Sequence, residues 1–167
     1  MIRMQDEKAW FTQAALQQQN SLYLLAFSIL KNDEDAKDAV QDALIQAYRN
    51  LDSLRDKSKF RPWIMKILTN CAYAALRKKA PAEQIETQWD LAAPEERIDI
   101  STKLSLWEAV QLLPLPYRTV VTLYYYENLS VKEIGKITDS RPDAVKKRLS
   151  RAREQLKQIL PKEVLES

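Results

Sequence analysis

The chain has 167 residues, a formal net charge of +3, one cysteine, one glycine and no histidine. A single cysteine excludes an intramolecular disulfide framework, and the lack of histidine excludes a Cys/His metal cluster. Hydrophobic residues make up 46% of the chain, which is enough to form a core and argues against global disorder. Tight hairpins need glycine or asparagine at positive φ, so the composition favours an all-helical fold.

The first part of the chain contains two helical patterns. A weakly amphipathic segment around Trp10 and Phe11 opens it, and apolar residues then recur at helical spacing over 22–30. A second helix is predicted after Asn32, a good N-cap residue, and its apolar period continues to Leu51. The acidic first turn of this helix suits the positive end of the helix dipole.

A polar loop over 52–59 separates the second helix from a third. Pro62 fits the first turn of the third helix, which ends in the basic run 77–79. One side of this helix is apolar and is traced by Trp63, Ile67, Cys71, Ala74 and Ala75. We therefore interpret the single cysteine as a small buried hydrophobe.

Residues 80–101 differ in composition from the segments on either side. They include two prolines, six acidic residues and one arginine, and their apolar periodicity is weak. These properties are typical of a linker. The sequence therefore predicts two small helical domains, 1–79 and 102–167, joined by an acidic linker at 80–101.

The second domain is predicted to begin with two short helices and a capped third. Apolar residues recur at helical spacing over 104–113, and Pro114 and Pro116 then end one helix and allow the next to start. Ser130 and Glu133 have the spacing of a capping box, in which each side chain satisfies a free backbone N–H. The third helix therefore begins immediately after Ser130.

A short turn at Thr138 and Asp139 precedes the last predicted helix. Residues 140–143, Ser-Arg-Pro-Asp, are a second helix-start signal. The apolar side of the last helix consists of Val145, Leu149, Ala152, Leu156 and Ile159. Two helices joined by a short turn, the second strongly basic, indicate a helix-turn-helix.

The second helix of a helix-turn-helix enters the major groove of DNA. Because its apolar side packs inward, the outward side is expected to carry Arg141, Lys146, Lys147, Ser150 and Arg151. Arginine and lysine bind guanine acceptors or phosphates, and serine does either more weakly. DNA contact is favoured over a merely solvated surface, but this motif alone leaves repressor, activator and sigma factor open.

A second basic block precedes and includes the third helix, and it contains aromatic residues. Phe60, Trp63 and Tyr73 alternate there with the cations Arg55, Lys57, Lys59, Arg61, Lys66, Arg77 and Lys78. Cations beside aromatic surfaces suit opened or single-stranded nucleic acid, because exposed bases stack and phosphates pair. Helical spacing alone does not separate stacking from packing, so Phe60 and Trp63 are equally consistent with a core role.

Catalysis finds no support in the sequence, which lacks histidine, a glycine-rich phosphate loop and a nucleophile motif. Asp35, Asp38 and Asp42 follow helical spacing on a polar face, which favours a solvated or partner-binding surface over an acid/base site. We therefore expect no enzyme activity, cofactor, metal or small-molecule substrate. The N-terminus lacks a signal-peptide core and no apolar run spans a bilayer, so we expect a cytoplasmic protein without membrane insertion.

Two long stretches resemble one known family. Residues 22–79 resemble region 2 of the extracytoplasmic-function (ECF) sigma factors of bacterial RNA polymerase, and residues 113–157 resemble their region 4. The resemblance implies two helical domains and promoter-specific transcription initiation with core RNA polymerase as partner. It also implies control by an anti-sigma factor, which in this family is often membrane-anchored. The alternatives are a stand-alone helix-turn-helix repressor or activator, or a helical scaffold that would leave both basic blocks unexplained.

The resemblance also implies site residues in region 2. The family motif that binds the polymerase clamp matches Asp35, Asp38, Gln41 and Asp42. The family's FRxW segment and a following asparagine match Phe60, Arg61, Trp63 and Asn70, which implies contacts with the opened −10 element. With the neighbouring cations, the expected −10 set is Lys57, Lys59, Phe60, Arg61, Trp63, Asn70, Arg77 and Lys78.

In region 4, the family's recognition-helix motif matches residues 144–153. The resemblance implies −35 contacts from Lys146, Lys147, Ser150 and Arg151, with Arg141 added from its position at the helix entry. The turn before this helix departs from the family pattern, since Asp139 replaces the usual glycine and Ser140 an apolar residue. Aspartate tolerates left-handed backbone better than most residues. Gly135, where alanine is commoner, is expected to keep the two helices close together.

Overall fold

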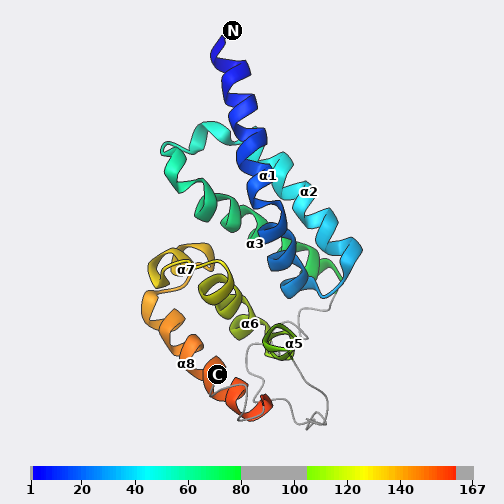
Figure 1. Ribbon diagram of the computed structural model, residues 1–167, viewed down its shortest axis with the longest axis vertical. Helices are drawn as coiled ribbons and strands as arrows, with labels where there is room; N and C mark the ends of the chain where they lie inside the picture. The colour runs from blue at the N-terminus through cyan, green and yellow to red at the C-terminus, as the bar shows by residue number, and fades with distance from the viewer. Residues whose placement is uncertain (1, 80–104, 161–167) are drawn as a thin grey trace. The chain divides into compact units, whose positions relative to one another are not determined.

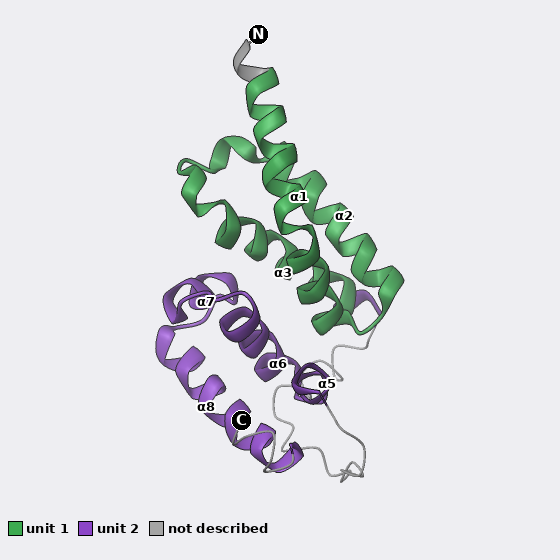
Figure 2. Cartoon of the chain, viewed as in Figure 1, with its two compact units in different colours: residues 1–76 green, residues 77–167 purple. Residues whose placement is uncertain are grey.

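The computed structural model describes residues 2–79 and 105–160 (Figure 1). Within these two ranges the regular secondary structure is helical and contains no strand, which confirms the predicted all-helical fold. The chain divides into two compact units, residues 1–76 and 77–167 (Figure 2). The predicted linker at 80–101 lies outside the described residues, so its boundaries stay predictions.

Unit 1 contains three long helices. They are α1 (Ile2–Leu30), α2 (Asp33–Arg49) and α3 (Phe60–Lys79). The segment around Trp10 and the pattern at 22–30 form one continuous helix, because no glycine or proline interrupts residues 2–30. Two short 3₁₀ turns, η1 (Leu51–Ser53) and η2 (Lys57–Lys59), lie between α2 and α3.

The corner between α1 and α2 is determined by local chemistry. Lys31 adopts a left-handed conformation with φ 55° and ends α1. Asn32 then caps α2 as predicted, because its side-chain oxygen accepts a hydrogen bond from the backbone N–H of Asp35 at 2.9 Å.

The core of unit 1 draws on all three helices and corrects the expected orientation of α3. Its fully buried side chains include Leu22, Leu25, Ile29, Ile64, Met65 and Leu68. The buried stripe of α3 runs through Ile64, Leu68 and Ala72, whereas the predicted stripe with Trp63, Ile67 and Cys71 is only half-buried. Both stripes are apolar, so periodicity alone could not choose between them. Partial burial raises the pKa of the Cys71 thiol, and the Asp42 carboxylate adds to this effect.

Unit 2 contains four α-helices within residues 105–160. They are α5 (Leu106–Gln111), α6 (Leu115–Val121), α7 (Val131–Ile137) and α8 (Pro142–Ile159). A π-helical turn, η3 (Thr122–Tyr126), extends α6. The capping box predicted for α7 is present, since Ser130 N–H donates to Glu133 at 3.0 Å and Glu133 N–H donates to Ser130 Oγ at 3.1 Å.

The core of unit 2 is formed where α8 packs against α6 and α7. It contains the predicted apolar sides of the last two helices: Ile134, Ile137, Val145, Leu149, Ala152 and Leu156. The last predicted position, Ile159, is half-buried. The inward orientation of α8 thus agrees with the sequence, which places its charged side chains outward.

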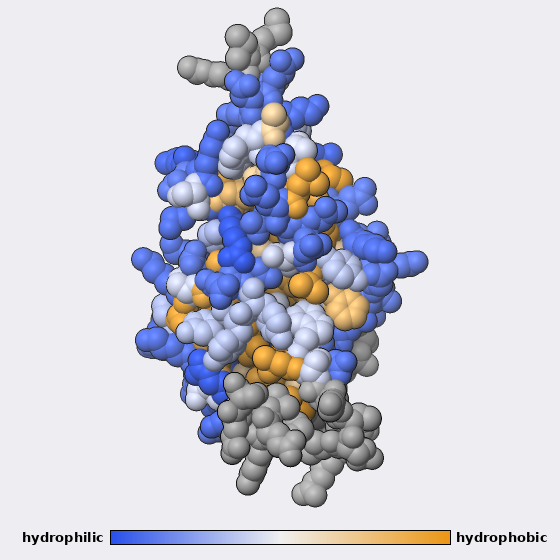
Figure 3. All heavy atoms as spheres, in the orientation of Figure 1, coloured by the Kyte–Doolittle hydropathy of each residue, from blue (hydrophilic) through white to orange (hydrophobic). Residues whose placement is uncertain are grey.

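Apolar side chains also reach the surface, where they form small groups among hydrophilic ones on the face drawn in Figure 3. The large exposed apolar residues of unit 1 are Leu16, Leu24, Ile45 and Tyr48. A search of the described residues finds no helix that combines the length and the apolar character required to span a bilayer.

Candidate polymerase and nucleic-acid interfaces

The four residues predicted to bind core polymerase lie along one face of α2, which we call the α2 face (Asp35, Asp38, Gln41 and Asp42). Three of them are exposed and Asp35 is half-buried, while alanines and a valine on the opposite face enter the core. The side chains of Asp38 and Asp42 make no hydrogen bond or ion pair with other described residues. Ile45, one turn beyond, is 43% exposed and continues the face with an apolar group.

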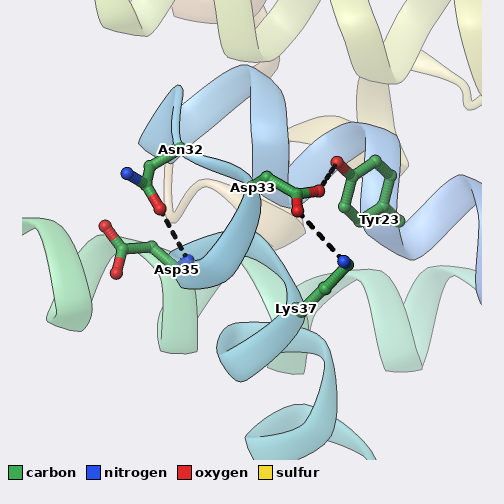
Figure 4. A network of polar contacts seen from close by, with 5 residues as sticks. All are labelled: Tyr23, Asn32, Asp33, Asp35 and Lys37. Carbon is green, nitrogen blue, oxygen red and sulfur yellow. Dashed lines mark hydrogen bonds and ion pairs between the residues drawn. The ribbon is translucent and has the colours of Figure 1, made fainter.

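A polar network connects the start of α2 with α1 (Figure 4). The Tyr23 hydroxyl donates a hydrogen bond to Asp33, and the Lys37 ammonium lies 3.0 Å from the same carboxylate. These two contacts, the Tyr23 hydrogen bond first, lower the pKa of Asp33, and the same hydrogen bond raises the pKa of Tyr23. The network ties the first turn of α2, from which the α2 face begins, to α1.

The loop that precedes α3 presents two exposed lysines. Asp56 caps η2 by accepting hydrogen bonds from the backbone N–H of Ser58 at 3.0 Å and from its hydroxyl at 2.7 Å. These bonds lower the pKa of Asp56, the hydroxyl contributing most. Lys57 and Lys59 are exposed, and the Lys57 ammonium lies 4.9 Å from the centre of the Trp10 ring of α1. This distance is within the range of a cation–π interaction.

An aromatic cluster lies at the start of α3. Phe60 is 5% exposed and packs edge-on against Trp10 and Phe11, with ring centroids 5.4 and 5.9 Å away. Trp63 lies 5.9 Å from Phe60 and is half-buried. The structure therefore favours packing over base stacking for Phe60, while Trp63 stays a candidate DNA contact.

The remaining predicted −10 residues lie on α3. Arg61 is half-buried, and its Nε donates a hydrogen bond to the Gln18 side chain of α1 at 3.2 Å. Asn70, Arg77 and Lys78 are exposed. Helical geometry aligns Trp63, Lys66, Asn70, Tyr73 and Arg77 along one side, which we call the α3 stripe.

The turn between α7 and α8 has the conformation that its unusual sequence allows. Asp139 has a left-handed backbone conformation with φ 51°. This conformation is the one that glycine adopts most readily. Arg141 occupies the N-cap position of α8 without a side-chain capping bond, and Pro142 follows in the first turn. The expected helix-start signal at 140–143 therefore lacks a side-chain cap.

The outward side of α8 carries every predicted −35 residue. Arg141, Lys146, Lys147, Ser150 and Arg151 are all exposed. Arg148, between them, is half-buried and bonds back to the turn. Further along, Arg153 donates from Nε to the Tyr125 hydroxyl of η3 at 2.6 Å, with its guanidinium 5.7 Å from that ring's centre.

Comparisons with known proteins agree with this arrangement. Residues 16–81 match Sigma-70 region 2, and residues 103–156 match Sigma-70, region 4. RNA polymerase sigma factor SigV of Bacillus subtilis is 31% identical over 165 residues, which cover 99% of each chain. ECF RNA polymerase sigma factor SigW of the same organism is 36% identical over 157 residues, covering 84% of this chain and 83% of that protein. The chain belongs to the ECF sigma factors of RNA polymerase.

Two solved structures share the fold of this sigma factor. The sigma factor RpoE, in complex with the anti-sigma factor NepR from Bartonella quintana, matches with a TM-score of 0.70 and 24% identity, covering 89% of this chain and 95% of that one. CnrH, in complex with the cytosolic domain of CnrY, matches with a TM-score of 0.64 and 23% identity over 90% and 86% of the chains. Family membership decides against a stand-alone repressor or activator.

Three side chains near the candidate interfaces of this sigma factor were missed by the sequence. From α1, Trp10 contacts the predicted −10 residue Lys57 and Gln18 contacts Arg61. Both pairs are more than forty positions apart in the sequence. Tyr125 of η3 accepts a hydrogen bond from Arg153 of α8 at the surface of unit 2. The contact of Trp10 could have been suspected because this aromatic residue lies in a polar N-terminal stretch. The contacts of Gln18 and Tyr125 depend on the tertiary structure.

Proposed function

We propose that this sigma factor distributes three binding tasks over three surfaces: core polymerase on the α2 face, the opened −10 strand on the α3 stripe and loop 52–59, and the −35 duplex on α8. The observation that carries the proposal is the exposure of all five predicted −35 side chains. Four of them lie on α8 away from its buried apolar residues, and Arg141 is at its N-cap. A helix oriented in this way presents its first turns to a major groove.

On unit 1, the proposal follows from the contrast between two faces of neighbouring helices. The α2 face is acidic, and Asp38 and Asp42 make no hydrogen bond or ion pair with other described residues, which suits a basic or polar protein surface better than DNA. The α3 stripe and the preceding loop combine lysines, arginines and a half-buried tryptophan, which suits single-stranded DNA. Unit 1 therefore meets polymerase and DNA on different helices.

The proposal is tested by reconstitution. The net charge of +3 provides little attraction for phosphates, so the free chain should bind promoter duplex weakly and gain specificity only with core polymerase. Transcripts with mapped 5′ ends, made by core polymerase with and without the protein, identify the promoters that it directs. Nanomolar, sequence-specific duplex binding by the free monomer would contradict the proposal.

On α8, the first and last basic residues should differ in role. Lys146 and Lys147 lie in the first half of the helix, where they reach base edges, so Lys146→Ala or Lys147→Ala should reorder a library of −35 sequences. Arg153, held by Tyr125, should contact phosphate, so Arg153→Ala should weaken all sequences alike and reduce the salt slope by about one unit. Holoenzyme binding to the library at two salt concentrations measures both effects. An unchanged ranking for both lysine variants would contradict base reading.

We also propose control by an anti-sigma protein, acting in the cytoplasm and held at the membrane in the form common to this family. The support is that both similar solved structures are described as complexes, one with an anti-sigma factor and one with a cytosolic domain. The test is to add a protein that co-purifies in stoichiometric amount to the reconstituted transcription reaction. Inhibition that excess core polymerase relieves would support the proposal, and unchanged transcription would contradict it.

A further inference from the structure

The turn between α7 and α8 is joined to the recognition helix by side-chain hydrogen bonds. Ser140 Oγ accepts a hydrogen bond from the Arg148 guanidinium at 2.7 Å and donates one to the backbone carbonyl of Thr138 at 3.1 Å. One hydroxyl thus connects the second turn of α8 to the residue that follows α7. We call Gly135, Thr138, Ser140 and Arg148 the turn network.

Gly135 allows this turn to pack closely against α7. The backbone N–H of Ser140 donates to the Gly135 carbonyl at 2.8 Å. A Cβ on Gly135 would lie 2.7 Å from the backbone oxygen of Ser140, a distance that requires the turn to shift. The only glycine of the chain therefore lies where the backbone of the turn leaves no room for a Cβ on α7.

The position of Arg148 also distinguishes it from its basic neighbours. Lys146 and Lys147 are exposed, whereas Arg148 is half-buried. A charged hydrogen bond shielded from water is stronger and more directional than one on the surface. The N-cap residue Arg141 makes no side-chain capping bond, and the turn network supplies a side-chain bond between the turn and this end of α8.

We propose that Ser140 and Arg148 are positioning residues for −35 recognition. They set the orientation in which α8 presents Lys146 and Lys147 to the major groove, and Arg148 does so by bonding Ser140 and not by contacting DNA. This inference rests on the proposed reading of the −35 element by α8. Hydrogen bonds to base edges weaken steeply with small changes in distance and angle, so a rotated α8 changes which bases are preferred.

The alternative role for Arg148 is a phosphate contact, and the two roles predict different results. Loss of a phosphate contact weakens all DNA sequences equally and lowers the salt slope. Loss of a positioning bond changes the order of preference among sequences. Removal of the acceptor at Ser140, which carries no charge, should then have the same effect as removal of Arg148.

The experiment uses holoenzyme and a library of −35 sequences at two salt concentrations. Ser140→Ala and Arg148→Gln should each change the preference at one or more −35 positions by about fivefold, the lower end of the effect of one lost base contact. Ser140→Thr keeps the hydroxyl and should retain the wild-type ranking. The double variant should change the ranking by less than the sum of the two single changes. Lys157→Gln removes a charge from the exposed last turn of α8 and serves as the control.

Two results would overturn the inference. One is a wild-type ranking for both Ser140→Ala and Arg148→Gln when Lys146→Ala alters it. The other is a uniform loss of affinity for Arg148→Gln alone, with a reduced salt slope, which identifies a phosphate contact. If Ser140→Ala fails to fold, Arg148→Gln removes the same bond from the other side. If the Lys146 and Lys147 variants also keep the wild-type ranking, the −35 proposal itself fails.

Discussion

The predicted −10 residues of unit 1 include aromatic rings, whereas the predicted −35 residues of unit 2 project from one amphipathic helix and its N-cap. In unit 1, Lys57 lies against Trp10 and Arg61 donates a hydrogen bond to Gln18, so these two cations are held by side chains of α1. In unit 2, Lys146 and Lys147 extend from α8 into solvent. The difference matches the two forms of DNA, because an opened strand offers bases to stack and a duplex offers a groove of defined shape.

The largest effect is expected at Phe60, an aromatic residue of the predicted −10 set that is buried in the core of unit 1. Since this ring is 5% exposed, Phe60→Ala should lower the free energy of unfolding of unit 1 by about 3–5 kcal/mol. Trp63→Ala, at a half-buried position, should cost less stability and impair promoter opening more. Urea unfolding and permanganate reactivity of the −10 region measure the two effects. A stable Phe60→Ala protein that binds duplex promoter but cannot open it would show that Phe60 contacts a base.

The acidic α2 face of unit 1, which we propose binds core polymerase, is the second point of comparison. Asp38→Arg or Asp42→Arg should weaken binding to core polymerase by about 2 kcal/mol, the size of an interface hot spot, and leave helical circular dichroism unchanged. Asp6→Arg, a charge reversal at an exposed position of α1, is the matched control. Competition with a labelled sigma factor for core polymerase measures the binding. Wild-type competition by both variants would place the polymerase contact elsewhere.

The contact between Lys57 and Trp10 tests whether an aromatic ring positions a cation of unit 1. A double-mutant cycle with Lys57→Met and Trp10→Leu should give a coupling energy of about 0.5–1 kcal/mol in promoter opening. The same cycle applied to Lys57 and Leu16, an exposed apolar residue on the same helix, should give none. Additive effects of the Lys57 and Trp10 substitutions would mean that the ring does not position the lysine.

The smallest expected effect is a pH dependence of the stability of unit 1, which comes from Asp33 at the corner between α1 and α2. Because the pKa of Asp33 is lowered in the folded state, its ionised form contributes stability above the ordinary value of 3.8. This contribution is lost as the pH falls through the lowered pKa. Asp33→Asn should therefore reduce the urea midpoint slightly at neutral pH, and the difference from wild type should shrink in acid. A difference that is independent of pH would contradict this role.

The sequence predicted those features that local chemistry or a one-sided pattern determines. Asn32 and Ser130 cap their helices through bonds to residues three positions later, and the apolar side of α8 is narrow and bounded by charges. The orientation of α3 was mispredicted because two neighbouring stripes are apolar.

Other features depend on residues distant in sequence. The burial of Phe60 requires rings from α1, and the bond between Ser140 and Arg148 requires the turn to be folded. Neither pattern is visible before the helices pack. The left-handed conformation of Asp139 lies between these cases, since its residue type allowed it and the tertiary structure selected it.

Helix α1 is unbroken from Ile2 to Leu30, so contacts made at different points along it keep a constant spacing. Trp10 meets the lysine of the −10 loop, and Tyr23, thirteen residues later, meets the first turn of α2. A helical rise of 1.5 Å per residue separates the two by about 20 Å of stiff rod. The number of residues between the two contacts determines their spacing and relative angle. A single inserted residue would rotate one contact by about 100° relative to the other. The proposed −10 loop and the proposed polymerase-binding α2 face are therefore held at a spacing and relative angle that the length of one helix determines.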